Sequence, residues 1–238
     1  MKTVGILQSN YIPWKGYFDI IGLCDEFILY DEMQYTKNDW RNRNKIKTAQ
    51  GTAWLTIPVD TKGKFSQKIN EARVLDHFWC RKHLNALRMN YSRAPFFKMY
   101  IDRIEELYRQ CEEEDHLSRI NYLFLKEICA MLGIDTRISW STDYELIEGK
   151  TERLVQLIKD AGGTQYISGP AAQDYIKEEL FKEAGIRLSW MDYSGYPEYP
   201  QLFGDFIPDV SILDLLFNVG DAARDYMKFS QKTGPAAE

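Results

Sequence analysis

Residues 3–30 contain a strand, a helix and a second strand in close succession, and this order restricts the fold more than any other feature of the sequence. Residues 3–7 (TVGIL) and 27–30 (FILY) are short apolar runs, and residues 17–23 have the apolar spacing of a helix. A unit of this length favours two parallel strands joined by a crossover helix. Because such sheets bind ligands at the carboxyl ends of their strands, we expect the loop QSNYIPWKG and Asp31 to face one crevice.

The alternation of strands and helices returns in the second half of the chain. The sequence predicts strands at 52–59, 136–140, 165–168 and 186–191, and helices at 77–108 (divided near Pro95), 117–132, 151–161, 172–184 and 211–217. This pattern is typical of an α/β fold with a mainly parallel sheet, flanking helices and a nucleotide-binding-like N-terminal βαβ unit. We expect a single domain over residues 1–238, with a helical insertion at about 77–132 and a frayed end at 232–238.

Composition excludes several classes of protein. The 238 residues are 45% hydrophobic and 14% aromatic, which is enough to form a substantial core. No stretch approaches the roughly 18 to 20 apolar residues of a membrane span, and the first residues do not resemble a secretory signal. We therefore expect a cytoplasmic protein without a membrane partner. The four cysteines and three histidines lack the spacing of metal sites, so we predict no metal.

A row of cations follows the second predicted strand. Arg41, Arg43, Lys45 and Lys47 recur at every second position, and in an extended segment they project from one face. On a chain with a net charge of -5, such a row is a candidate anion site. An exposed edge strand protected by its charges would have the same pattern, so both interpretations stay open.

Other single residues have a structural interpretation beside the functional one. His83 lies on or beside the apolar face of its predicted helix, where it is either a base or a packing residue. Tyr11, Trp14 and Tyr17 suit a ring-bearing ligand but are equally suited to the core. Asp214 and Asn218 share a face of the last predicted helix and are candidates for a site. A helix docked over the proline-rich loop is the alternative interpretation and is preferred.

Several strings of the chain, in this order, resemble the WbqC-like family of bacterial proteins, found among genes for surface-polysaccharide sugars. They are ILQSNYIPWKGYFDII, the stretch from Asp31 through Tyr35 to WRNRNKI, TAWLTIPV, His83 with the later Tyr91 and AP, YISGPAAQDYI, and YPQLFGDFIPDVSILDLLFNVG. The resemblance covers nearly the whole chain. Family members commonly have Gln-Pro where this chain has Gln8-Ser9, a difference that affects only the stiffness of the loop.

The resemblance implies transfer of glycine, or a related acyl unit, to an amino sugar in O-antigen (lipopolysaccharide) synthesis. Such an N-acyltransferase needs a base for the amine, donors for the oxyanion, and cations for the diphosphate of a nucleotide-linked sugar. The candidates are His83 or Asp31 as base, Arg41, Arg43 and Lys45 for the diphosphate, amides near Gly16 or Gly169 for the oxyanion, and Tyr11, Trp14 and Tyr199 for stacking. Further candidates for substrate binding are Gln8, Tyr17, Gln34, Lys37, Asn44, Ser168, Gln201, Asp214 and Asn218.

The expected partners are a dTDP-type nucleotide-linked amino sugar and glycine or its activated form, and a homodimer stays open. For activation, glycyl-adenylate made from ATP with Mg²⁺ is one candidate. A charged tRNA is a weaker one, because the chain lacks an extended basic surface. The competing hypothesis is a non-catalytic sugar-nucleotide-binding or scaffold protein of the same pathway, since the sequence has no nucleophile elbow and no catalytic triad.

Overall fold

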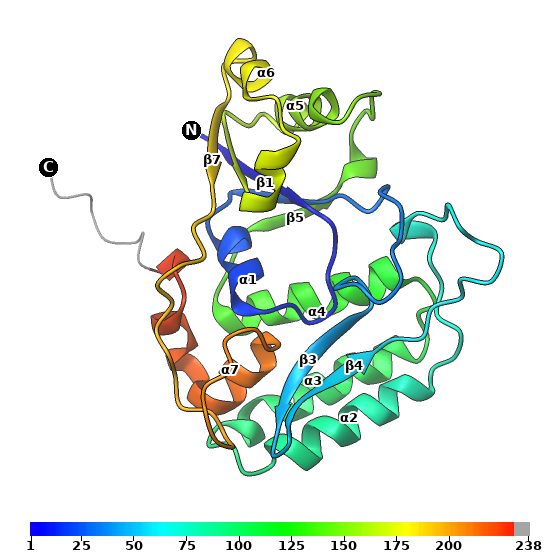
Figure 1. Ribbon diagram of the computed structural model, residues 1–238, viewed down its shortest axis with the longest axis vertical. Coiled ribbons are helices and arrows are strands. Elements are labelled where there is room, and N and C mark those ends of the chain that lie inside the picture. The colour runs from blue at the N-terminus through cyan, green and yellow to red at the C-terminus, as the bar shows by residue number, and fades with distance from the viewer. Residues whose placement is uncertain (231–238) are drawn as a thin grey trace, which may run out of the picture.

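The computed structural model describes residues 1–230, so the frayed end predicted at 232–238 lies outside the described residues. It contains a five-stranded parallel sheet in the order β5-β2-β1-β6-β7. The sheet lies in the upper half of the molecule in Figure 1. The strands are β1 (Thr3–Leu7), β2 (Glu26–Leu29), β5 (Arg137–Trp140), β6 (Gln165–Ser168) and β7 (Arg187–Trp190). The predicted α/β fold with a parallel sheet and an N-terminal βαβ unit is confirmed.

Helices cover both faces of this sheet. The larger apolar cluster joins Phe27 and Leu29 of β2 to α1 (Lys15–Gly22) and α4 (Leu117–Leu132). The smaller cluster joins Val4, Ile6 and Ile28 to α5 (Thr151–Asp160) and α6 (Glu178–Glu183). Neighbouring residues of β2 therefore pack on opposite sides, as the alternation of side chains along a strand requires. Burial on both faces explains why β1 and β2 are largely apolar.

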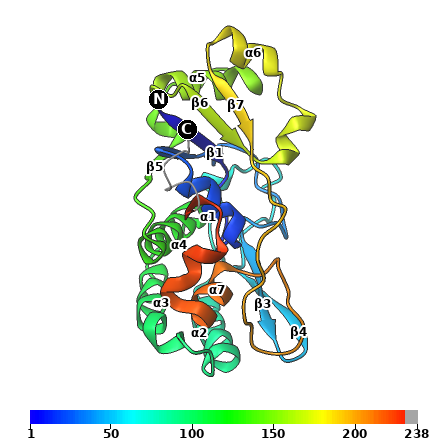
Figure 2. The same cartoon turned by 90° about the vertical axis from the view of Figure 1, so that its left-hand side faces the viewer.

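A long insertion separates β2 from β5. It contains an antiparallel hairpin of β3 (Arg43–Thr48) and β4 (Gly51–Thr56), followed by α2 (Phe78–Tyr91), α3 (Phe97–Cys111) and α4. After β7, residues 192–210 form an irregular strap that leads to α7 (Ile212–Val219). The hairpin, α2, α3 and α7 lie at the end of the molecule opposite α5 and α6 (Figures 1 and 2). The short 3₁₀ segments are Ile69–Glu71, Ser141–Asp143, Pro170–Asp174 and Gly220–Tyr226.

Most predicted elements are confirmed, and two differ. The helix predicted at 117–132 is present, and it ends before Gly133, which has the left-handed conformation (φ 63°) that favours glycine. The predicted helix at 172–184 is wrong in its first half, because a 3₁₀ turn ends at Asp174 and α6 begins only at Glu178. Between them Ile176 packs into the smaller apolar cluster, which interrupts the helix. The predicted strand at 52–59 ends at Thr56, shortly before Pro58.

Within residues 1–230, no helix combines the length and the apolar character that crossing a membrane requires. The same part of the chain holds no group of three or more histidine, cysteine or acidic side chains placed to bind a metal ion.

Candidate functional site

The loop of residues 8–14 leaves β1 at the point where the sheet reverses its direction of winding. From β1 the chain continues to β2 on one side and returns later to β6 on the other. Ligands of parallel sheets bind at such a point, beyond the carboxyl ends of the strands. Within the loop Ile12 is buried and has φ 35°, a conformation that is unfavourable for a β-branched residue. Such strain persists only where the surroundings enforce it.

Hydrogen bonds from three other segments enforce this loop conformation. The side-chain amide of Asn44 donates to the carbonyl oxygens of Tyr11 (3.3 Å) and Ile12 (2.9 Å). The Tyr17 hydroxyl donates to the carbonyl of Gln8 (2.8 Å), and the backbone N–H of Tyr11 donates to the carbonyl of Trp40 (3.0 Å). Among the predicted site residues, Tyr11, Tyr17 and Asn44 therefore hold the loop in place.

Asp31 also holds the loop and does not face open space. It is buried at the end of β2, where it accepts a hydrogen bond from the backbone N–H of Ser9 (2.7 Å) and another from the Ser118 hydroxyl of α4. Burial raises the pKa of its carboxyl, against the opposing effect of the hydrogen bonds from Ser118 and Ser9. From the other side, the Asn121 amide donates to the Ser9 hydroxyl (3.0 Å). This geometry makes Asp31 a positioning residue.

His83 supports the loop from beneath. Its Nδ1 lies 2.9 Å from the hydroxyl of Tyr11, which is also 2.7 Å from the hydroxyl of Tyr108. The imidazole is buried against the Trp79 ring, with the ring centroids 5.2 Å apart. Burial lowers the pKa of His83 to about 4. A neutral imidazole that fixes Tyr11 has the features of a packing residue.

His83 is expected to make the folded state less stable as the pH falls from 6.5 to about 4. Folding lowers the pKa of His83 from 6.5 to about 4. As the pH falls, the imidazole is therefore protonated first in the unfolded chain, and this protonation stabilises the unfolded state relative to the folded state. This difference corresponds to about 3 kcal/mol. Urea unfolding at pH 7 and pH 4.5 measures it, with His83→Gln as the variant that should lose this part of the pH dependence. The other histidines, His77 and His116, are present in both proteins, so an identical pH dependence would contradict the assignment.

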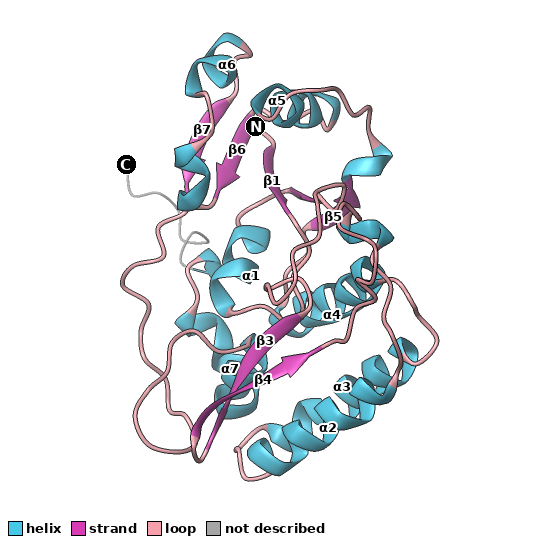
Figure 3. Cartoon of the chain, turned by 45° about the vertical axis from the view of Figure 1, so that its right-hand side comes forward, coloured by secondary structure: helices cyan, strands magenta, loops and turns pink. Residues whose placement is uncertain are grey.

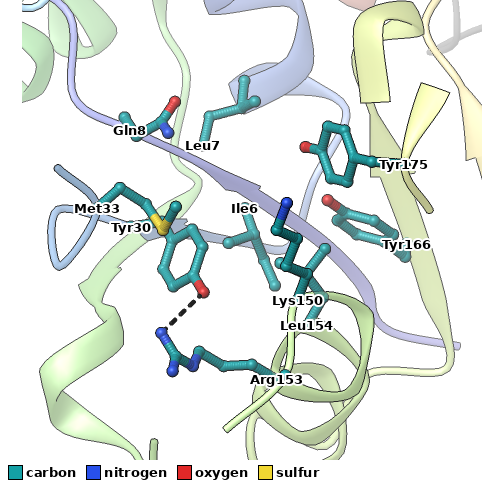
Figure 4. Close-up of a pocket in the computed structure, with 11 residues that line it drawn as sticks. Ile6, Leu7, Gln8, Tyr30, Met33, Lys150, Arg153, Leu154, Tyr166 and Tyr175 are labelled. Carbon is teal, nitrogen blue, oxygen red and sulfur yellow. Dashed lines mark hydrogen bonds between the residues drawn. The ribbon is translucent and has the colours of Figure 1, made fainter. Parts of the chain in front are cut away.

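Three adjoining cavities open along the carboxyl edge of the sheet, and together we call them the crevice. The Arg41 cavity measures about 320 Å³, and the Trp40 cavity about 220 Å³. The Tyr30 cavity measures about 460 Å³ and lies towards α5 (Figure 4). Gln8 lines both the Arg41 and the Tyr30 cavities, while Asn10, Trp14 and Trp40 are shared by the Arg41 and Trp40 cavities. Of the predicted residues, the crevice brings together Gln8, Trp14, Tyr17, Arg41, Asn44 and Gly169.

Arg41 is the cation at the middle of the crevice. Its guanidinium donates to the side-chain oxygens of Gln8 (2.6 Å) and Asn10 (3.3 Å), and it lies 3.6 Å from the carboxylate of Asp39. Since a guanidinium has five N–H donors in a rigid plane, donors remain for an anion in the cavity.

The other members of the cationic row have different neighbours. Register places Arg43, Lys45 and Lys47 on one face of β3, as predicted. The Arg43 guanidinium lies 4.1 Å from the ring centroid of Trp54, and Lys45 pairs with Asp209. Lys47 is buried and donates to the Gln201 side chain (3.0 Å). Each therefore already has a partner outside the Arg41 cavity.

A second group of predicted residues forms a buried cluster around Asp214. This carboxylate accepts hydrogen bonds from the hydroxyls of Tyr91 (2.8 Å) and Tyr199 (2.9 Å), and burial raises its pKa. Gln201 donates to the Tyr199 hydroxyl (3.1 Å), and Asn218 donates to the Asp214 carbonyl (2.8 Å). The cluster fastens the strap to α7 and β3, away from the crevice.

Four predicted residues lie elsewhere. Gln34 is exposed and donates to the carbonyl of Phe65 (2.7 Å), and Lys37 is exposed. Ser168 is buried and accepts a hydrogen bond from Tyr166 (3.1 Å). Gly16 leaves room for the indole of Trp14, because a Cβ there would come within 2.4 Å of that ring.

Sequence reasoning missed several residues that line the crevice: Asn10, Trp40, Asp209 and Tyr193 on one side of Gln8, and Tyr30, Lys150, Arg153, Tyr166 and Tyr175 on the other. Asn10 lies within the loop that the carboxyl-end rule selects, and Tyr30 directly precedes Asp31, so that rule was sufficient to find them. Lys150 and Arg153 carry no such signal, since nothing local relates the start of α5 to β1.

Comparison with known proteins gives a consistent family assignment. The family model described as "WbqC-like protein family" matches residues 8–226. The uncharacterized protein Rv1507c of Mycobacterium tuberculosis (strain ATCC 25618 / H37Rv) is 53% identical over 232 residues, which cover 98% of this chain and 100% of the relative. No solved structure matches. The matched residues include the loop after β1, the insertion and α7, so the chain belongs to the WbqC-like protein family.

Proposed function

We propose that this protein transfers an acyl group, glycyl in the first instance, to the amine of a nucleotide-activated amino sugar in bacterial surface-polysaccharide synthesis. The observation that carries the proposal is the position of Gln8 and Arg41 at the switch point of the sheet. Gln8 lines both the Tyr30 and the Arg41 cavities, and it accepts a hydrogen bond from Arg41, whose cavity adjoins the Trp40 cavity. A nucleotide-linked sugar is an elongated ligand with a charged centre. The Tyr30 cavity, Arg41 and the Trp40 cavity follow one another along the crevice, and this order suits such a ligand. The family resemblance supports the acyl transfer.

The sugar is assigned to the Trp40 cavity. Trp14 and Trp40 supply two indole walls, and an indole combines a large apolar face with a polar N–H. Asn10, Asn44 and Asp209 line the same space with amide and carboxylate oxygens. These groups can accept hydrogen bonds from sugar hydroxyls and from an amine. In this arrangement Arg41 contacts the phosphate next to the sugar.

Acyl transfer also requires donors for the oxyanion of the tetrahedral intermediate. Gly169 lines the Arg41 cavity, and with no side chain it lets a reacting carbonyl approach the backbone. We propose that glycine and ATP with Mg²⁺ form glycyl-adenylate and pyrophosphate. The sugar amine then attacks the glycyl carbonyl, AMP leaves, and the amine proton passes to solvent. A charged tRNA is the second donor, with the tRNA as the leaving group. Residues 1–230 offer no cluster of metal-binding side chains, so in this proposal the Mg²⁺ arrives with ATP.

Acyl transfer is expected when the protein is incubated with a dTDP-linked 4-amino-4,6-dideoxy sugar, glycine, ATP and magnesium. Mass spectrometry of the sugar nucleotide should then detect a glycyl adduct that is absent without the protein. The same reaction with glycyl-tRNA in place of glycine and ATP separates the two donors. If neither donor yields an adduct with any of several amino sugars, the proposal is wrong.

A non-catalytic sugar-nucleotide-binding protein is the second candidate, and one observation favours it. The two residues predicted as bases, His83 and Asp31, are both buried and hydrogen-bonded to the loop instead of facing the crevice. A binding protein would take up the dTDP-sugar with Arg41-dependent affinity and form no adduct with either donor. Calorimetric titration beside the mass-spectrometric assay separates the two functions.

A further inference from the structure

The Tyr30 cavity is the largest space of the crevice, and none of its side chains except Gln8 was expected to bind substrate. It lies beyond the carboxyl ends of β1 and β2, beside the first turn of α5. Ile6, Met33 and Leu154 contribute apolar surface to it, while cationic and phenolic groups face them (Figure 4). Its volume of about 460 Å³ lies in the range of about 300–1,000 Å³ that is usual for small-molecule sites.

Two cations of this cavity lack an acidic partner. No carboxylate of residues 1–230 lies within 4.0 Å of the side-chain nitrogens of Lys150 or Arg153. Lys150 is exposed, whereas Arg153 is half-buried and donates to the carbonyl of Ile147 (2.5 Å) and to the hydroxyl of Tyr30 (3.4 Å). Figure 4 shows both cationic groups directed into the cavity. A half-buried guanidinium without a counter-charge favours an anionic ligand.

Three tyrosines complete the wall. Tyr166 is buried and stacked on Phe181, with ring centroids 5.4 Å apart and an interplanar angle of 5°, so its position is fixed. Tyr175 leaves 53% of its surface exposed, which is unusual for a large aromatic side chain unless another group covers it. Figure 4 places the rings of Tyr30 and Tyr175 on opposite sides of Lys150. Aromatic faces of this kind stack on nucleobases.

We infer that the Tyr30 cavity binds the nucleoside of the substrate and the phosphate attached to it, with this phosphate on Lys150 and Arg153 and the base against Tyr30 and Tyr175. The phosphate next to the sugar then lies in the adjoining cavity, on Arg41. The inference rests on the proposed function, because the sugar then lies across Gln8 in the Trp40 cavity. A nucleotide from ATP has the same chemistry, so the experiment must compare the two sources.

Calorimetric titration of the full chain with dTDP, thymidine and ATP tests this assignment. Wild-type protein should bind dTDP at least tenfold more tightly than thymidine, a difference of about 1.4 kcal/mol, because thymidine lacks the phosphates that the two cations contact. Lys150→Ala should weaken dTDP about tenfold and leave thymidine unchanged. Tyr175→Ala should weaken both. Lys159→Ala, an exposed lysine at the other end of α5, is the matched control and should change neither.

Each remaining outcome decides against a defined part of the inference. Equal dTDP affinity in wild type, Lys150→Ala and Tyr175→Ala would remove the nucleotide from this cavity. If ATP binds tenfold more tightly than dTDP with the same sensitivity to Lys150→Ala, the cavity holds the donor nucleotide instead of the sugar nucleotide. If dTDP binding follows the expected pattern while no glycyl adduct forms, the assignment of the nucleotide to this cavity is supported and the proposed acyl transfer is wrong. If glycyl adducts form while Lys150→Ala and Tyr175→Ala leave the dTDP affinity unchanged, the acyl transfer is supported and the nucleotide assignment is wrong.

Discussion

Arg41→Ala is expected to lower kcat/KM for acyl transfer about 100-fold, whereas Arg43→Ala should leave it within about twofold. Loss of two charge-assisted hydrogen bonds to a phosphate corresponds to about 3 kcal/mol, which is roughly this factor. Arg41 lines the crevice between Gln8 and Asn10, while Arg43 lies over Trp54 of the hairpin. Steady-state kinetics with the dTDP-sugar measures both variants.

The two arginines are matched controls for each other, since they are two residues apart and equally charged. Arg41→Lys keeps the charge and loses the planar fork, so an intermediate loss of about tenfold is expected. The free energy of unfolding should fall by less than about 1.5 kcal/mol in either alanine variant, because each side chain is partly solvated. A larger loss of kcat/KM for Arg43→Ala than for Arg41→Ala would contradict the assignment and place the anion site on the hairpin face.

Asp31→Ala is expected to abolish most activity by releasing the loop after β1, together with about 2–4 kcal/mol of folding stability. The change leaves the backbone N–H of Ser9 and the hydroxyl of Ser118 buried without their acceptor. Asp31→Asn keeps an oxygen for the Ser9 N–H, so it should retain activity within about tenfold of wild type. Urea unfolding and the acyl-transfer assay measure the two effects.

The pair of Asp31 variants separates positioning from catalysis. A general base acts through its ionised carboxylate, so an amide in its place would cost about 10²- to 10⁴-fold in turnover. A positioning carboxylate needs only to accept hydrogen bonds from Ser9 and Ser118. A stable Asp31→Asn protein with turnover reduced to that extent would contradict the positioning role and make Asp31 the base.

Local sequence determines much of the fold. Apolar runs with small-residue turns mark β1, β2 and β6, and Gly133 marks the end of α4 because its left-handed conformation favours glycine. Continuity of a helix is harder to predict. The segment before α6 has good helix formers, but burial of Ile176 against the sheet outweighs their propensity.

Of the candidate site, the sequence predicts only which residues lie at the carboxyl ends of the parallel strands. This topology rule places Gln8 and Gly169 at one edge of the sheet, because their strands end there. It does not give the direction of a side chain. Asp31 turns inward because α4, from a distant part of the insertion, presents Ser118 to it. Lys150 and Arg153 reach the same edge from α5, more than a hundred residues after β1.

The hairpin illustrates the same limit. Spacing alone correctly places Arg43, Lys45 and Lys47 on one face, but their partners come from the strap and from β4. Figure 3 shows that strap beside the hairpin, and the two segments are more than 150 residues apart in sequence. Whether a cationic row is free for a ligand therefore depends on long-range packing that a local pattern does not contain.

The central claim is that the crevice at the carboxyl edge of the sheet is the substrate site. A crystal structure of the full chain with the dTDP-linked amino sugar tests it most directly. We expect density for the base between Tyr30 and Tyr175, for the diphosphate from Lys150 and Arg153 to Arg41, and for the sugar against Trp14 beyond Gln8. Density for the same ligand on the hairpin beside Arg43 and Trp54, with the crevice free of it, would contradict the claim.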